Sequence, residues 1–362
     1  MSRIVATYRV RAAAAEIDRR AQAIAVEQSV EMPLAAIDDP TVLADVVGRV
    51  DGIADNGDGS FAVRIALAVS TTGPEAGQLL NMLFGNTSIH DDVTLEDAAL
   101  PAEVAAAFGG PRHGIAGLRR RSGAAGRAMT CSALKPQGLA PAALAALAGR
   151  MAAGGIDFIK DDHGMADQAY GRFADRVRAC AAAVRAAGTR TTYLPSLSGD
   201  LDSLRAQVRI AHEEGLDAVL VAPMVIGVPA FHALVRAFPE VAFMAHPAMA
   251  GAARIAPPLL IGTLFRLLGA DAVVFPNHGG RFGYAPATCR ALADAARGPA
   301  HGLAPAIPVP AGGMTLDRVD EMLDFYGPDT MLLIGGDLLS ARERLTEAAT
   351  AFTRRVAGHR YG

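Results

Sequence analysis

The sequence has little of what several classes of protein need. Its three cysteines, Cys131, Cys180 and Cys289, are odd in number and widely spaced, so they fit neither a disulfide framework nor a zinc ribbon and indicate a reducing compartment. No apolar run approaches the roughly 20 residues of a membrane helix, and the first residues lack the apolar core of a signal peptide. With 34 basic and 37 acidic residues the net charge is −3, and there is no long basic block. We therefore expect a cytoplasmic protein that binds neither membranes nor nucleic acid.

The N-terminal third of the chain mixes strand and helix patterns. Some segments alternate apolar and polar residues with the period of a strand, and others are Ala-rich with charges spread around them, as in a helix. A Gly- and Pro-rich segment from Phe108 to Gly114 marks the expected linker. The pattern predicts strands at 4–10, 61–69 and 88–95 and helices at 12–26 and 75–84.

From about residue 125 a different pattern begins, in which apolar strands alternate with amphipathic segments rich in Ala, Leu and Arg. Such alternation predicts parallel βα units, and eight units in about 235 residues match the number and size of a (β/α)8 barrel. The expected strands are 128–134, 156–160, 191–194, 218–222, 241–245, 272–275, 307–310 and 331–334.

Polar residues or helix breakers follow the carboxyl end of nearly every one of these strands. Catalytic groups of this architecture lie at that end of the barrel. A single ring of residues around one substrate is therefore a more economical interpretation than eight unrelated loops. The main members of this ring are Lys135, Lys160–His163, His246, Asn277–Arg281, Gly312-Gly313 and Gly335-Gly336.

The stretch Gly154–His163 (GGIDFIKDDH) ends an apolar strand on four ionisable residues. Unpaired charge cannot stay in a core, and Lys160 and Asp162, two residues apart, point the same way on a strand. A carboxylate suits a hard cation such as Mg²⁺, whereas His163 shifts the preference toward softer metals. Lys160 could be a ligand only by losing its proton or by carrying an added carboxylate. The alternative is a salt-bridge network at the strand end.

The other strand ends also allow two interpretations each. Lys135, partly desolvated beside a metal, would be a general base; otherwise it is a surface lysine with a buried stem. The Gly312-Gly313 and Gly335-Gly336 pairs could hold a phosphate through backbone N–H groups or form tight turns. His246 is catalytic or structural. Arg281, flanked by glycines, could clamp an anion from a mobile lid or lie in a flexible surface loop.

Taken together, these motifs resemble the RuBisCO superfamily. The resemblance is carried by GGIDFIKDDH, by LKPQG at 134–138, by FGNTS at 84–88, by FGGPRHGI at 108–115 and by the two Gly-Gly loops. It implies an α/β fold class, with an N-terminal α+β ferredoxin-like domain over residues 1–118 and a C-terminal (β/α)8 TIM barrel over residues 119–362.

The resemblance also implies roles for individual residues. Lys160 would take up CO2 as a carbamate and, with Asp162 and the residue at position 163, hold Mg²⁺ or another divalent metal. Lys135 would be the general base, His246 an active-site histidine, and the glycine pairs the phosphate loops. Asn86 and Glu27 match residues that reach the active site of a neighbouring subunit, so we expect a homodimer with shared sites.

Several positions depart from the carboxylase pattern. The third metal ligand is His163 instead of a glutamate, and Gln137 replaces the second lysine of the first-strand motif. Val274 and Pro247 stand where carboxylases have a histidine and an arginine, and Arg281 stands in place of the lysine that orients CO2. The sequence therefore resembles a RuBisCO-like protein and not a true carboxylase.

This pattern retains the residues for enolisation and lacks those for CO2 capture. We expect a metal-dependent isomerase or lyase that enolises a phosphorylated ketose or keto acid, of the methylthio-pentulose phosphate type, through a metal-stabilised enediolate. One alternative is a decarboxylase or hydrolase of a branched 3-oxo sugar-acid phosphate. Another is a non-catalytic sugar-phosphate-binding protein.

Overall fold

The computed structural model describes residues 2–299 and 302–361 and divides into two compact units. Unit 1 contains the chain up to Gly109 and the segment Met249–Leu260, and unit 2 contains nearly all of the remainder. The division falls inside the Gly- and Pro-rich linker segment, whereas the boundary expected after residue 118 lies within helix α4 (Gly114–Ser122). Within the described residues no helix is long and apolar enough to cross a membrane.

Unit 1 is built on a four-stranded antiparallel sheet in the order β2-β3-β1-β4. Strand β1 buries Ile4, Ala6, Tyr8 and Val10, which is the period-2 alternation that predicted it. The elements of this unit are β1 (Arg3–Arg11), β2 (Arg49–Asp55), β3 (Ser60–Ala68), β4 (Val93–Ala99), α1 (Ile17–Glu27), α2 (Ala76–Phe84) and α3 (Ala102–Phe108).

The structure corrects the sequence analysis of unit 1 in two places. Strand β2 was not predicted, because it lies at the edge of the sheet and its charged residues Arg49, Asp51 and Asp55 are exposed. The strand expected over 88–95 begins only at Val93, because Asn86–Ile89 form a 3₁₀ turn.

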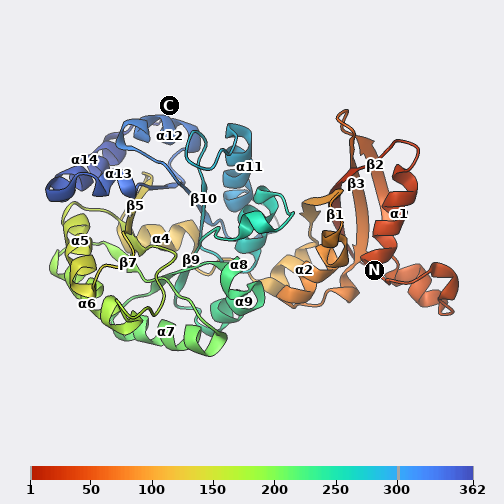
Figure 1. Cartoon of the computed structure of the whole chain (residues 1–362), viewed down its shortest axis with the longest axis horizontal. Helices are drawn as coiled ribbons and strands as arrows, with labels where there is room; N and C mark the ends of the chain where they lie inside the picture. Colours follow the sequence, from red (N-terminus) through yellow and green to blue (C-terminus); the bar gives the residue numbers. More distant parts are fainter. Residues whose placement is uncertain (1, 300–301, 362) are drawn as a thin grey trace. The chain divides into compact units, whose positions relative to one another are not determined.

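Unit 2 contains the barrel, and all eight predicted strands are confirmed within one or two residues at each end (Figure 1). The strands are β5 (Met129–Leu134), β6 (Phe158–Asp161), β7 (Thr192–Leu194), β8 (Ala218–Val221), β9 (Ala242–Ala245), β10 (Ala272–Pro276), β11 (Ile307–Ala311) and β12 (Met331–Leu333). The helices after α4 are α5 (Pro141–Ala153), α6 (Phe173–Ala186), α7 (Leu201–Glu213), α8 (Pro223–Ile226), α9 (Val228–Ala237), α10 (Phe265–Leu267), α11 (Pro286–Arg297), α12 (Val319–Tyr326), α13 (Gly336–Leu339) and α14 (Leu345–Gly358).

The barrel strands form two parallel ladders, β12-β5-β6-β7 and β11-β10-β9-β8. A bridge between Ser196 and Leu220 joins the ladders on one side. On the other side β11 lies beside β12 without a continuous ladder. The amides of β11 that pair belong to Ile307, Val309 and Ala311 and face β10, so Pro308 and Pro310 occupy the positions that would donate toward β12. Proline has no N–H, and this explains the interrupted ladder.

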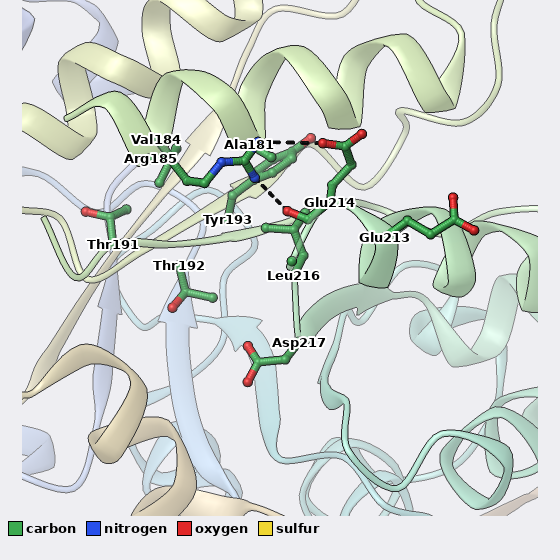
Figure 2. A pocket seen from close by; sticks show the side chains of 11 residues that line it. Ala181, Val184, Arg185, Thr191, Thr192, Tyr193, Glu213, Glu214, Leu216 and Asp217 are labelled. Carbon is green, nitrogen blue, oxygen red and sulfur yellow. Dashed lines mark hydrogen bonds and ion pairs between the residues drawn. The ribbon is translucent and has the colours of Figure 1, made fainter. Parts of the chain in front are cut away.

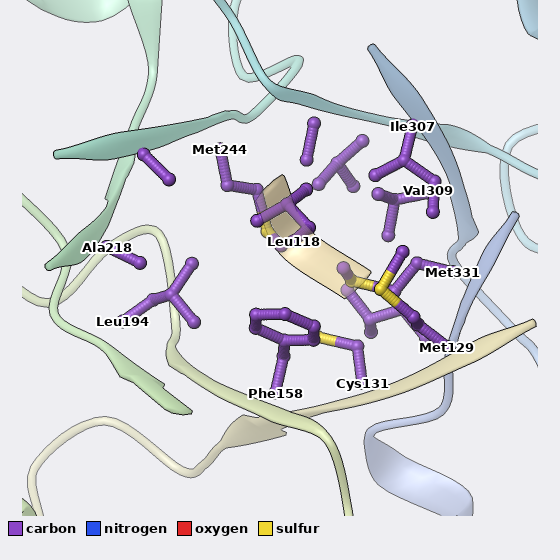
Figure 3. Close-up of a cluster of buried hydrophobic side chains, with 14 of the residues drawn as sticks. Leu118, Met129, Cys131, Phe158, Leu194, Ala218, Met244, Ile307, Val309 and Met331 are labelled. Carbon is purple, nitrogen blue, oxygen red and sulfur yellow. The ribbon is translucent and has the colours of Figure 1, made fainter. Parts of the chain in front are cut away.

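The interior of the barrel is filled by apolar side chains from all eight strands (Figure 3). Ile115 and Leu118 of helix α4 join this cluster. Burying a Val, Leu, Ile, Phe or Met side chain contributes about 1.5–3 kcal/mol to stability. The centre of the barrel is therefore a packed core, and a substrate must bind at one of its ends.

The alternation of side chains along a strand places several predicted site residues on the same side of their strands as the core residues. Cys131, Phe158 and Met244 point into the cluster, so the residues two and four positions further along each strand point the same way, nearer its carboxyl end. Those residues include Lys135 after β5, Lys160 on β6 and His246 after β9. Three predicted site residues, from three different strands, therefore point toward the barrel axis at the carboxyl ends of their strands.

Candidate active site

Five of the predicted site residues meet at the carboxyl ends of β5, β6 and β9. The Lys135 Nζ donates to Asp162 Oδ1 at 2.5 Å, and the His163 Nδ1 lies 3.5 Å from the same oxygen. The ring of His163 stacks on that of His246, with centroids 4.1 Å apart and an interplanar angle of 8°. Lys160 precedes Asp162 on the same face of the strand. The residues form one cluster and not separate surface groups.

Lys160 is buried at the end of β6, with 3% of its surface exposed. Its Nζ donates to the carbonyl oxygen of Asp161 at 3.0 Å. Burial lowers the pKa of Lys160, since removing an ammonium from water disfavours its charged form. A lysine of this kind has a larger neutral fraction at neutral pH than a solvated one, and a neutral amine is the form that reacts with CO2.

Asp162 is held as a carboxylate by its neighbours. Burial alone would raise its pKa, but hydrogen bonds from His163 and Lys135 and the charges of Lys135 and Lys160 hold the pKa of Asp162 well below its ordinary value. The side chain is therefore negatively charged across the whole neutral range. It is the central anion of the cluster, and its oxygens are available to a cation.

His246 has a defined protonation state and tautomer. Burial, followed by the charge of nearby Lys160, lowers the pKa of His246 to about 2, so the ring is neutral. The Ala248 N–H donates to His246 Nδ1 at 3.1 Å. Because Nδ1 accepts a hydrogen bond, the single ring proton resides on Nε2.

The same residues allow the fit of a metal ion to be judged. The described residues contain no cluster of three His, Cys, Asp or Glu side chains suited to a metal. Asp162 and His163 supply two donors at one corner of the cluster, and Lys160 lies beside them on the same strand. A carboxylate added to Lys160 would supply the third donor, so the residues fit a divalent ion on that condition.

The two glycine pairs end β11 and β12 at the same end of the barrel. Gly312 and Gly313 have positive φ angles of 83° and 107°, and the Arg281 N–H donates to the Gly312 carbonyl at 2.9 Å. A Cβ on Gly280 would lie 2.3 Å from that carbonyl oxygen. Glycine is thus required on both sides of this contact, and the expected lid segment lies against the Gly312-Gly313 loop.

Arg281 and the second glycine pair are placed less tightly. The guanidinium of Arg281 is exposed and lies 5.2 Å from the centroid of the Phe282 ring. Gly335 lies beside Ala133 of β5, and Gly336 begins α13. The structure therefore brings Gly312 and Gly313 together with the lid backbone but places the charge of Arg281 in solvent.

Asn86 and Glu27 belong to unit 1 and lie together there. The Asn86 Nδ2 donates to Glu27 Oε1 at 2.9 Å and to Glu31 Oε1 at 3.0 Å. All three side chains are at least partly exposed. The two residues predicted to act across a subunit boundary are therefore one polar group on the surface of unit 1.

A cavity of about 420 Å³ lies elsewhere in the barrel unit (Figure 2). Helix α6 and the turn from Glu213 to Asp217 line it, together with the first residues of β7. This is the amino-terminal end of β7 and β8. None of the predicted site residues lines this cavity, so the candidate site is the cluster at the opposite strand ends.

Sequence reasoning missed the partners of Asp161. This aspartate points away from the barrel axis and accepts hydrogen bonds from Arg176 Nε at 2.9 Å and from the Tyr193 hydroxyl at 2.7 Å. Both partners are buried. An arginine in an amphipathic helix has the pattern of a solvated residue, so no signal in the sequence marks Arg176.

Comparisons with known proteins show the family to which this chain belongs. The model of the family described as "Ribulose bisphosphate carboxylase large chain, catalytic domain" matches residues 114–359. The chain belongs to the RuBisCO large-chain family. The matched region contains the complete barrel and every barrel residue of the candidate site.

Among members of the RuBisCO family, this chain is similar to RuBisCO-like proteins. A relative from Rhodospirillum rubrum, named 5-methylthioribulose-1-phosphate isomerase, is 62% identical over 361 residues that cover 98% of this chain and 96% of the relative. A solved RuBisCO-like protein from Rhodopseudomonas palustris is 55% identical, with a TM-score of 0.93 and 99% of each chain covered. A 2,3-diketo-5-methylthiopentyl-1-phosphate enolase from Geobacillus kaustophilus is 32% identical over 76% of this chain and 70% of the relative.

Proposed function

We propose that this RuBisCO-like chain is a metal-dependent isomerase that enolises a phosphorylated ketose, with 5-methylthioribulose 1-phosphate as its substrate. The observation that carries the proposal is the convergence of Lys135, Lys160, Asp162 and His246 at the carboxyl ends of three strands. The relative from R. rubrum that bears this activity in its name supports the choice of substrate.

Asp162, His163 and a carbamate on Lys160 would hold the divalent ion, either Mg²⁺ or, because of the histidine, a softer metal. When bound, the ion would supply positive charge that stabilises an enediolate. The buried amine of Lys160, whose pKa is lowered by burial, suits the uptake of CO2. This use of CO2 is a modification of the protein and not a step of the reaction.

Lys135 is the proposed base. In this proposal the Lys135 Nζ accepts the proton from the carbon next to the substrate carbonyl, and the electrons of the broken C–H bond form the enediolate double bond while the carbonyl oxygen becomes negative. Return of a proton to the former carbonyl carbon, with loss of the hydroxyl proton from its neighbour, completes the isomerisation. The Nε2–H of neutral His246 is positioned as a donor to a substrate oxygen.

The phosphate would bind at the Gly312-Gly313 and Gly335-Gly336 loops, whose backbone N–H groups can approach an anion closely. At position 247, after β9, an apolar proline stands in place of the arginine of the carboxylase pattern. The loss of this positive charge favours a substrate that has one phosphate and an apolar group, such as a methylthio group, at its other end.

A second candidate is enolisation of 2,3-diketo-5-methylthiopentyl 1-phosphate, which the relatives named as enolases favour. It uses the same proton abstraction at the same site. The expected homodimer, in which Asn86 and Glu27 complete the site of the other subunit, is part of the proposal for either substrate.

Incubation of the protein with each substrate, in Mg²⁺ and bicarbonate, tests the proposal. ³¹P NMR should show conversion of 5-methylthioribulose 1-phosphate to an isomeric phosphate ester, and EDTA should abolish it. Ribulose bisphosphate with labelled CO2 should show no incorporation. Failure to convert the ketose with Mg²⁺, Mn²⁺ or Co²⁺ would overturn the assignment, and conversion of the diketone alone would replace it with the enolase.

A further inference from the structure

One buried arginine, on the helix layer outside the barrel, forms hydrogen bonds to the segment that contains Asp162 and His163. Arg176, on the first turn of α6, has only 1% of its surface exposed. Its Nε donates to Asp161 Oδ2 at 2.9 Å. Its Nη1 donates to the carbonyl oxygens of Ala166 at 2.8 Å and Gly171 at 3.0 Å. One guanidinium thus joins the end of β6 to two points on the loop that follows it.

Asp161, the partner of Arg176, lies in the chain between Lys160 and Asp162, two residues of the candidate site. Its carboxylate is fully buried and also accepts from the Tyr193 hydroxyl at 2.7 Å and the Ser196 N–H at 3.0 Å. Its carbonyl oxygen accepts a hydrogen bond from the Lys160 Nζ. Because side chains alternate along a strand, fixing Asp161 toward the helix layer fixes Lys160 and Asp162 toward the barrel axis.

Stability alone is a weak explanation for this pair. Apolar residues of similar size in place of a buried ion pair are often neutral or stabilising, because two charges must lose their hydration. The guanidinium fork, however, offers donors in fixed directions that no apolar side chain supplies. The three hydrogen bonds that Arg176 donates from Nε and Nη1 all go to residues 161–171, which surround Asp162 and His163 in the chain.

We propose that Arg176 is a positioning residue for the active site: through Asp161 and the carbonyl oxygens of Ala166 and Gly171 it holds Lys160, Asp162 and His163 in their working arrangement. It does not touch the reacting atoms. Partners of this kind behind metal-binding residues typically change activity or metal affinity about 10–100-fold when they are replaced. The effect on turnover rests on the proposed function, whereas the effect on the loop does not.

The chain offers a matched control in Arg266. This arginine is 2% exposed and has a similar set of bonds, from Nε to the Ala304 carbonyl at 3.0 Å and from Nη1 to the carbonyls of Ala295 and Gly298 at 3.1 and 2.8 Å. Its acceptors lie around the end of α11, near the amino-terminal end of β11. It therefore matches Arg176 in burial and in its bonds from Nη1 to two backbone carbonyls, but its Nε bonds a carbonyl instead of a carboxylate, and no site residue is among these acceptors.

The test compares Arg176→Lys with Arg266→Lys in the full-length protein. Lysine keeps a positive charge opposite Asp161, but a single ammonium cannot make all three bonds of the fork. Amide hydrogen exchange followed by mass spectrometry should show faster exchange over residues 162–172 in Arg176→Lys only. The kcat of Arg176→Lys should fall about 10–100-fold with a smaller change in KM, and calorimetry should show weaker Mg²⁺ binding. Arg266→Lys should lower the Tm by about as much as Arg176→Lys does, but it should keep the wild-type kcat.

Unchanged exchange over 162–172, or a kcat that falls no further in Arg176→Lys than in Arg266→Lys at equal Tm, would overturn the positioning role. If the wild type has no activity on the ketose, the proposed function fails, and exchange and Mg²⁺ binding still decide the role of Arg176. If Arg176→Lys does not fold, the double variant Asp161→Asn/Arg176→Met, which leaves neither charge buried, takes its place with the same expected results.

Discussion

Two buried carboxylates at the amino-terminal end of the barrel are held differently from Asp162 at its carboxyl end. At the amino-terminal end, Asp157 precedes β6 and accepts both Nη groups of Arg127 at 2.8 Å, together with the N–H and hydroxyl of Thr130. Asp271 precedes β10 and accepts three backbone N–H groups, at 2.7–2.9 Å. At the carboxyl end, the carboxylate of Asp162 contacts the side chains of Lys135, His163 and Gln137.

The difference lies in the partners and not in the burial. Asp157, Asp271 and Asp162 all have less than a tenth of their surface exposed. Asp157 is held by a bidentate arginine, a backbone N–H and a hydroxyl, and Asp271 is held by three backbone N–H groups, so each has partners that are fixed in the chain. Asp162 is held by long side chains that can turn away. A buried carboxylate with exchangeable partners can accept a cation or a substrate, whereas one with fixed partners only stabilises the fold.

The largest effect that separates the two ends should come from Lys135. Lys135→Met removes the proposed base but keeps the apolar stem of a side chain that is 37% exposed. We expect kcat/KM for 5-methylthioribulose 1-phosphate to fall about 10²–10⁴-fold. The Tm should also fall, because buried Asp162 loses one of its partners, so the rates are compared well below the Tm of the variant. A loss below tenfold in a ³¹P NMR rate assay would mean that another group takes the proton.

Asp157→Ala should have the opposite signature. It leaves Arg127, about a quarter exposed, without its partner and removes the acceptor of Thr130. Breaking a buried pair of this kind costs about 3–5 kcal/mol, and we expect the lower end of that range because Arg127 reaches water. Urea unfolding measures the loss of free energy. The folded fraction should keep the wild-type kcat, and a specific loss of turnover would contradict the division of roles between the two ends.

Two glycines at opposite ends make a finer comparison. Gly313 has φ 107°, and a Cβ there would lie 3.1 Å from Gly280 Cα; Gly188, after α6, has φ 68° and open space around it. Alanine at either position costs about 1–2 kcal/mol of backbone strain. Only Gly313→Ala should also raise the KM, about tenfold, because it displaces the loop proposed to bind the phosphate. Equal KM values for Gly313→Ala and Gly188→Ala would argue against phosphate binding at Gly313.

The smallest effect is a dependence of stability on pH. The pKa of His246 is about 2 in the folded chain and 6.5 when unperturbed, so between these values the unfolded chain binds one more proton than the folded chain. The free energy of unfolding therefore falls as the pH falls from 6.5, by up to about 1.4 kcal/mol per pH unit. His246→Asn should reduce this slope between pH 4 and 6.5, as measured by urea unfolding. An identical slope in both proteins would show that His246 is not buried as a neutral ring.

Much of this arrangement could be predicted from the sequence, for a physical reason. A buried parallel strand is a continuous apolar run, so a polar residue at its end marks the rim of the barrel. This rule located Lys135, Lys160, Asp162 and His246. It could not find Arg176 or Tyr193, because their burial depends on Asp161 pointing into the helix layer, which the sequence pattern of α6 does not show.

The same reasoning explains the errors. Strand β2 was missed because an edge strand can expose charged residues on both faces. The boundary expected after residue 118 falls within α4, whose Ile115 and Leu118 belong to the barrel core.

The central claim, that Lys135 and its neighbours abstract a proton from a phosphorylated ketose, is tested most directly by solvent deuterium. The protein is incubated with 5-methylthioribulose 1-phosphate in D2O with Mg²⁺ and bicarbonate, and the recovered sugar phosphates are examined by ¹H NMR. In the wild type, we predict deuterium at the carbon beside the carbonyl in the recovered substrate and at the former carbonyl carbon in the product. In Lys135→Met, we predict no deuterium at either carbon. Turnover without any deuterium in substrate or product, or equal labelling by Lys135→Met, would contradict the central claim.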